Sequence, residues 1–162
     1  YEEAINYHQQ NLQIARNIGD RRGESEALGN LGNVYRSLSN FRKAMIYYQQ
    51  DLQIARKIGD RQGECSALGN IANALDGLKQ YQQAIDSYHK ALSIAQTIES
   101  NHLIVLTKCN LADTLIKIGE LEEAEEYLRQ SLQLSREIGD RSTEALALKY
   151  FAELYDLSLI HI

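Results

Sequence analysis

The chain contains no proline and no tryptophan, only two cysteines, and no long apolar run in its 162 residues. Because proline breaks helix interiors, its complete absence suits a chain that is almost wholly helical. The two cysteines, Cys65 and Cys109, are too few for a disulfide framework, so we expect a reducing, cytoplasmic setting. No apolar segment approaches the roughly 18–20 residues that cross a bilayer, so the sequence predicts no membrane partner.

Charge and composition also narrow the possible partners. The formal net charge is −5, whereas nucleic-acid binding needs a basic face, so we expect no nucleic-acid partner. An apolar fraction of 44% with 24% charged residues is normal for a folded domain. The chain begins at Tyr1 in the middle of a pattern, and we therefore expect it to be a piece of a longer protein.

What the chain does contain is a repeat of 40 residues, present four times without insertion or deletion. The first copy opens with YEEAINYHQQNLQIARNIGD, and the second opens at Phe41 with FRKAMIYYQQDLQIARKIGD. Two further copies begin at Tyr81 and Leu121. A fixed period of this length indicates a stack of similar supersecondary units and argues against a globular enzyme.

Each copy carries two apolar stripes with three- and four-residue spacing, which predict two helices. In the first copy these stripes lie at 4–18 and 27–35, and Gly19 and Asp20 between them suit a helix C-cap and an N-cap. In the third copy Ser100 takes the capping position. The pattern predicts an all-α solenoid of about eight antiparallel helices. Its expected parts are a first helix at 1–19, helix pairs at 21–58, 61–98 and 101–138, a last helix at 141–157, and an off-pattern tail at 158–162.

Small residues occupy one position of the second helix in every copy. They are Gly32, Ala72, Ala112 and Ala152. Glycine in a helix interior costs about 1 kcal/mol relative to alanine, so Gly32 needs a packing reason. We expect the second helix of the first copy to approach the following helix closely at this point.

The segment Leu28–Tyr35, LGNLGNVY, followed by Ala44 and Tyr48, resembles the tetratricopeptide repeat. The resemblance covers essentially residues 1–155. The GDR-x-x-E joint and the ALGN-x-x-N core are similar to a 40-residue subclass found in G-protein-signalling modulators, with related repeats in kinesin light chains and bacterial signalling proteins. The resemblance implies a right-handed superhelix of helix hairpins whose concave groove holds peptides.

The chain also departs from the family pattern at several positions. Lys108 stands where a large apolar residue is usual, and Asn11, Asp51 and Ser131 stand where the family usually has alanine. Family members that grip acidic C-termini use lysine and arginine in the groove. Since this chain has glycine, cysteine, asparagine and aspartate at the matching positions, we do not expect that ligand class.

A column of asparagines forms the candidate binding surface. Asparagine both donates and accepts hydrogen bonds, so such a column can pair with the backbone of a bound segment. The alternative is that these side chains bond between neighbouring repeats. The candidate groove residues are Asn30, Asn70 and Asn110 at one position, Asn33, Asn73 and Asp113 three residues on, and Arg36 and Glu26 in addition.

No catalytic or metal-binding constellation is predicted. The four histidines fall at different registers of the repeat, and the two cysteines lack a zinc-ligand spacing. Gly19 and Gly59 are helix stops, not part of a phosphate-binding loop. We therefore expect neither a catalytic residue, nor a metal, nor a cofactor.

These patterns predict a non-catalytic scaffold for protein–protein interaction in signalling, which binds a peptide or partner segment in the concave groove. The alternative is a regulatory or oligomerisation arm of a larger multidomain enzyme or signalling protein. The first helix lacks a preceding partner, and the last exposes a stripe with Leu148, Phe151 and Tyr155. Open apolar faces promote association, so we also expect end-to-end self-association.

Overall fold

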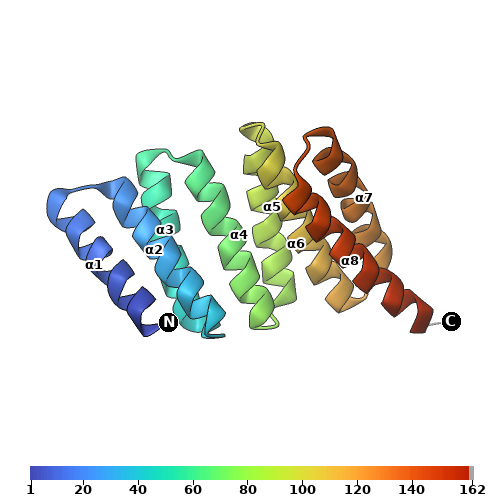
Figure 1. The fold of residues 1–162 in the computed structure, drawn as a ribbon, viewed down its shortest axis with the longest axis horizontal. Helices are drawn as coiled ribbons and strands as arrows, with labels where there is room; N and C mark the ends of the chain where they lie inside the picture. Colours follow the sequence, from blue (N-terminus) through green and yellow to red (C-terminus); the bar gives the residue numbers. More distant parts are fainter. Residues whose placement is uncertain (161–162) are drawn as a thin grey trace. The chain divides into compact units, whose positions relative to one another are not determined.

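The structure is a computed structural model that describes the backbone of residues 1–160 and the side chains of residues 1–156. Over these residues the regular secondary structure is helical (Figure 1). The helices are α1 (Glu2–Ile18), α2 (Arg21–Ser37), α3 (Phe41–Ile58), α4 (Arg61–Gly77), α5 (Tyr81–Thr97), α6 (Asn101–Ile118), α7 (Leu121–Glu137) and α8 (Arg141–Ile160).

The helices form two compact units, Tyr1–Ser87 and Tyr88–Ile162, and the division falls inside α5. In the first unit α2 packs against α1 and α3, α3 also packs against α4, and α2 touches α4. In the second unit α7 packs against α6 and α8, and α6 touches α8. Consecutive helices from α1 to α4 run antiparallel, as expected for helix hairpins (Figure 1).

The helix ends follow from local chemistry. Gly19 ends α1 with φ 74°, a left-handed conformation that glycine adopts without steric cost. Asp20 then caps α2, because its Oδ1 accepts a hydrogen bond from the Gly23 amide at 2.9 Å. These two caps confirm the predicted boundary. Ser100 precedes α6 as expected, but its side chain makes no capping hydrogen bond.

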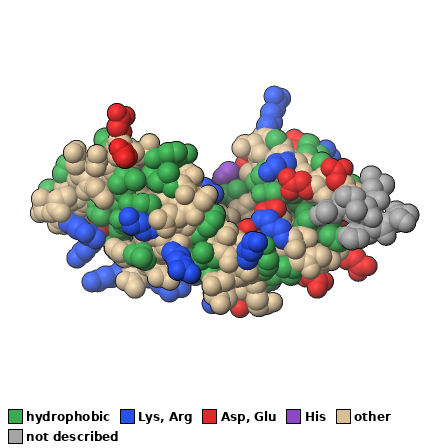
Figure 2. Space-filling view, turned by 90° about the horizontal axis from the view of Figure 1, so that it is seen from below, with side chains coloured by type: hydrophobic (Ala, Val, Ile, Leu, Met, Phe, Trp, Pro, Cys, Tyr) green, Lys and Arg blue, Asp and Glu red, His purple; other side chains and the backbone are tan. Residues whose placement is uncertain are grey.

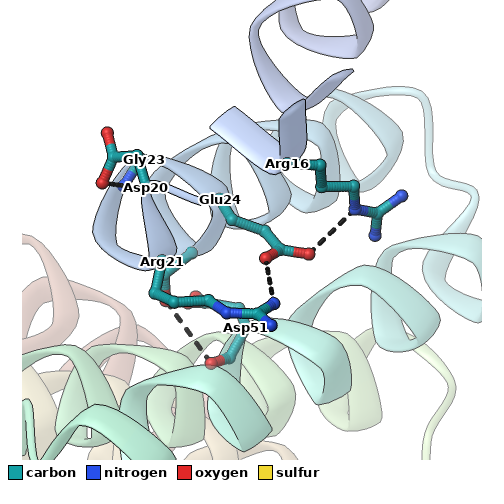
Figure 3. Close-up of polar contacts among 7 residues, drawn as sticks. Arg16, Asp20, Arg21, Gly23, Glu24 and Asp51 are labelled. Atoms are coloured by element: carbon teal, nitrogen blue, oxygen red, sulfur yellow. Dashed lines mark hydrogen bonds and ion pairs between the residues drawn. The ribbon is translucent and has the colours of Figure 1, made fainter. Parts of the chain in front are cut away.

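Ion pairs between a buried glutamate and half-exposed arginines also tie one helix to the next at the joints. Glu24 of α2 is buried and accepts from Arg16 Nε of α1 and from Arg21 Nη1, each at 2.8 Å (Figure 3). The hydrogen bond from Arg16 is the main cause that lowers the pKa of Glu24. The same arrangement recurs one period later around Glu64, which pairs with Arg56 at 2.8 Å.

The core of the first unit is tightest where α2 meets α3. Tyr48 of α3 is completely buried, and a Cβ added at Gly32 of α2 would lie 2.3 Å from its Cε1 atom. Leu28 and Leu31 of α2 are also completely buried. The predicted close approach at Gly32 is therefore present, and a glycine is needed there because the Tyr48 ring occupies the space of a side chain.

The last helix departs from the sequence expectation. α8 continues to Ile160, beyond residue 157, where we expected it to end. The remainder of the expected tail, 161–162, lies outside the described residues.

Figure 2 shows acidic and basic side chains next to one another on the displayed face of the second unit.

Candidate functional site

A cavity of about 360 Å³ opens on the first unit between α2 and α4. We call it the α2–α4 groove. Of the residues proposed from the sequence, the groove brings together Glu26, Asn30, Asn33 and Asn70. Asn30 of α2 and Asn70 of α4 are one repeat apart, so the period places equivalent amides on two neighbouring helices of this surface.

Asn33 has a structural partner as well as a place in the groove. Its Oδ1 accepts a hydrogen bond from the Tyr48 hydroxyl at 2.8 Å. The sequence left open whether the asparagines bind a partner or bond between neighbouring repeats, and this contact ties Asn33 to the other helix of its own pair, 21–58. The Asn33 amide nitrogen is not used in this contact, and the residue is half-buried beside the groove.

The other proposed residues lie elsewhere. Asn73 and Arg36 belong to the first unit but do not line the α2–α4 groove. Asn110 and Asp113 lie on α6 of the second unit. There Asp113 pairs with Lys117 at 2.8 Å, so part of its charge is balanced on its own helix.

Asp51 of α3 is a groove residue that the sequence analysis did not propose as a site. Its carboxyl accepts a hydrogen bond from the Ser25 hydroxyl of α2 (Figure 3). Only 9% of the residue is exposed. Burial, with a smaller contribution from the Asp60 charge, raises the pKa of Asp51 to about 6. The available signal was its departure from alanine, the residue usual at this position in the resembled family.

Among the charged residues that line the groove, acids predominate. Glu26, Asp51 and Asp60 contribute carboxylates, whereas Arg22 contributes a guanidinium. Arg22 Nε lies 3.8 Å from Glu26 Oε1, and both side chains are exposed, so this pair is weak. Asp60 accepts from the Gly63 amide as the N-cap of α4. The groove therefore favours donors and positive charge.

The second unit has different residues at the matching register. Two periods after Gly29 and Asp51 the chain has Cys109 and Ser131, both completely buried. Burial raises the pKa of the Cys109 thiol to about 11, which keeps it protonated. Nearby, Lys108 is tied to α7, because its Nζ donates to Gln130 Oε1 at 2.7 Å.

Among the described residues, no group of three or more His, Cys, Asp or Glu side chains is placed to hold a metal ion. Within the same part of the chain, no helix combines the length and apolarity that crossing a membrane requires.

Several known proteins are similar to this chain. A segment of 41 residues is 51% identical to G-protein-signaling modulator 1 of Homo sapiens, and covers 25% of the chain and 6% of that protein. In fold, BtubC (BKLC) from P. vanneervenii matches with a TM-score of 0.83 and 20% identity over 97% of the chain and 66% of that protein. A Rap protein complexed with competence and sporulation factor matches with a TM-score of 0.87 and 19% identity over 97% of the chain and 44% of Rap. The chain thus spans less than two thirds of each of these proteins.

A family model described as tetratricopeptide repeat matches residues 1–57 and 63–137, which is more than half of the chain. Repeats of this family generally mediate protein–protein interaction and are generally non-catalytic. The two structural matches agree in fold with an α-helical hairpin solenoid. By its repeat pattern, its paired helices and this match, the chain belongs to the tetratricopeptide repeat family.

Proposed function

We propose that this chain is a non-catalytic scaffold that binds a peptide or partner segment in the α2–α4 groove. The observation that carries the proposal is the convergence of Asn30, Asn33 and Asn70 on one open cavity. Amide side chains at this spacing can pair with the donors and acceptors of an extended or helical backbone. The bound segment would lie across α2 and α4.

The glycine beside Asn30 supports a close approach of the ligand backbone. Gly29 lines the groove next to Asn30 and carries no side chain. A backbone that approaches there can reach the amides of Asn30 and Asn70.

The similar proteins are compatible with this function. The similar Rap protein was solved in complex with competence and sporulation factor, and this supports the proposal that the present chain also binds a partner segment. Asn73 and Arg36 remain candidate contacts in the first unit, and Asn110 and Asp113 remain candidates for a separate contact on the second unit. Cys65 and Cys109 are buried and form no disulfide, which suits the cytoplasm as the compartment of the interaction.

The test is a binding comparison with the double variant Asn30→Ala/Asn70→Ala. Within the described residues neither side chain takes part in a hydrogen bond, so the fold should persist and the far-ultraviolet circular dichroism should be unchanged. Partners are captured with the full-length protein, identified by mass spectrometry and measured with purified components by calorimetry. We expect at least a tenfold loss of affinity, about 1.4 kcal/mol.

The matched control is the double variant Gln13→Ala/Gln53→Ala. These glutamines are also one period apart, but they are exposed on α1 and α3 and do not line the groove. The control should bind as the wild type does. If the asparagine variant binds its partner with unchanged affinity, the groove assignment is wrong.

A second candidate role is that of an oligomerisation arm, and α1 favours it. Tyr7, Ile14 and Ile18 are exposed on one side of this helix. They line a further cavity of about 380 Å³ between α1 and α2. Exposed apolar surface of this kind is typical of a protein–protein interaction face.

A further inference from the structure

Asp51 is a buried carboxylate without a counter-charge. Its Oδ1 accepts from the Ser25 hydroxyl, and among the described residues no hydrogen bond or ion pair engages its Oδ2. Removing a carboxylate from water is costly unless a cation or several hydrogen bonds compensate. One hydroxyl compensates for this cost only in part, and Asp51 Oδ2 can still accept a hydrogen bond from a further donor.

The repeat itself shows that the fold does not need this charge. At the register of Asp51 the other copies carry Asn11, Ala91 and Ser131, and at that of Ser25 they carry Cys65, Val105 and Ala145. Ala91 and Ser131 are completely buried without any charge. A neutral residue therefore packs between the helices at this position, and the acid of the second copy is not a packing requirement.

Gly29 gives the groove access to the unused oxygen. A Cβ added at Gly29 would lie 3.1 Å from Asp51 Oδ2, so a side chain there would crowd this atom. Both residues line the α2–α4 groove. In the second unit Cys109 replaces the glycine, and Ser131 beneath it is completely buried. The combination of a glycine and a carboxylate at these two positions is therefore found in the first unit, whereas the second unit has Cys109 and Ser131 there.

The surrounding charges select the kind of group that would enter. Glu26 and Asp60 add negative potential to the groove, and Arg22, in a weak exposed pair with Glu26, is the one basic side chain among its described lining residues. We propose that the α2–α4 groove binds a lysine or arginine side chain of the partner segment, with its cationic head on Asp51. Charge-assisted hydrogen bonds to a partly buried carboxylate are about twice as strong as neutral ones. This inference rests on the proposed function and specifies the chemistry of its ligand.

Binding of a cation at this position depends on the ionisation of Asp51. Ser25 of α2 donates to Asp51, the Asp60 charge before α4 and the Tyr48 hydroxyl of α3 interact with it, and Arg22 and Glu26 of α2 line the same groove. With a pKa of about 6, Asp51 is ionised at pH 7.5 and mostly protonated at pH 5.0. The affinity for a basic side chain should therefore fall about tenfold between these pH values.

The experiment titrates the isotopically labelled chain with the peptide acetyl-Ala-Ala-Arg-Ala-Ala-amide and follows backbone amide shifts by nuclear magnetic resonance. The comparison peptide carries citrulline, a neutral isostere of arginine. The variants are Asp51→Asn, which removes the charge, and Gly29→Ala, which crowds Oδ2. Their controls are Asp86→Asn, an exposed acid on α5, and Gly69→Ala, where the added methyl meets no atom within 4 Å.

We expect the arginine peptide to shift the amides of Ser25, Gly29 and Asp51 at pH 7.5, at least fivefold more tightly than the citrulline peptide. Asp51→Asn and Gly29→Ala should abolish this preference, and both controls should retain it. Equal binding of the two peptides, or no shift at these amides at millimolar peptide, overturns the cation site. The function proposed above is judged separately, by the Asn30→Ala/Asn70→Ala variant and its captured partner.

Discussion

At the scale of single residues, Asp51 links stability to pH. Burial raises its pKa from 3.8 to about 6 in the folded chain. The folded state therefore favours the protonated acid: this stabilisation is fully present below the unfolded pKa and is lost as the pH rises through about 6. A neutral residue that keeps the Ser25 hydrogen bond should remove the dependence.

We predict that Asp51→Asn raises the free energy of unfolding at pH 7.5 by up to about 3 kcal/mol, since one pKa unit corresponds to about 1.4 kcal/mol. The gain should shrink as the pH falls from about 6 towards 4. Urea unfolding at several pH values measures it, with the exposed Asp86→Asn as the control. A gain that is independent of pH, or a loss of stability at pH 7.5, would contradict this account.

At the scale of elements, the spacing of α2 and α3 depends on Gly32. A methyl group at this position would meet the buried Tyr48 ring at 2.3 Å, and Tyr48 is further held by its hydrogen bond to Asn33. Gly69, in contrast, has open space where its Cβ would be. The two glycines therefore respond to the same substitution in opposite directions.

We predict that Gly32→Ala lowers the free energy of unfolding by about 1–2 kcal/mol, because overpacking exceeds the gain in helix propensity. Gly69→Ala should raise it by up to about 1 kcal/mol. Thermal and urea unfolding of the two variants provide the measurement. Equal effects of the two substitutions would show that Gly32 does not set the distance between α2 and α3.

Much of each element could be predicted from the sequence. The cap pair Gly19 and Asp20 marks a helix boundary because its chemistry is local, and the structure confirms it. The end of α8 was placed too early, since the repeat ends there and offers no cap signal. The contact between Asn33 and Tyr48 could not be predicted, because it depends on how two helices face each other.

At the scale of the whole molecule, the repeat relates two exposed tyrosines to a packed pair. Tyr35 of α2 and Tyr47 of α3 stack with ring centroids 5.4 Å apart. In register, Tyr155 of α8 corresponds to Tyr35 and Tyr7 of α1 to Tyr47. Tyr155 is 53% exposed and Tyr7 is 62% exposed. We therefore expect α8 of one copy to pack against α1 of a second copy, as α2 packs against α3.

We predict that the chain self-associates head to tail and that Tyr7→Lys weakens this association at least tenfold, through lost stacking and apolar contact. Analytical ultracentrifugation over a range of concentrations measures it. Gln13→Lys, an exposed substitution on the same helix with the same added charge, is the control. A wild-type chain that stays monomeric at high concentration would contradict the prediction.

The sequence by itself determined the helices, their pairing and the family, because a period of 40 residues with apolar stripes and capping residues depends on local spacing. The tertiary structure decided which polar residues share a site. It gathered Asn30, Asn33 and Asn70 in one groove, and it added Asp51, which the sequence marked only by its departure from the family's usual alanine. The physical reason is that burial and the pKa of a carboxylate depend on neighbouring helices, and these are set by packing between helices and not by spacing along one of them.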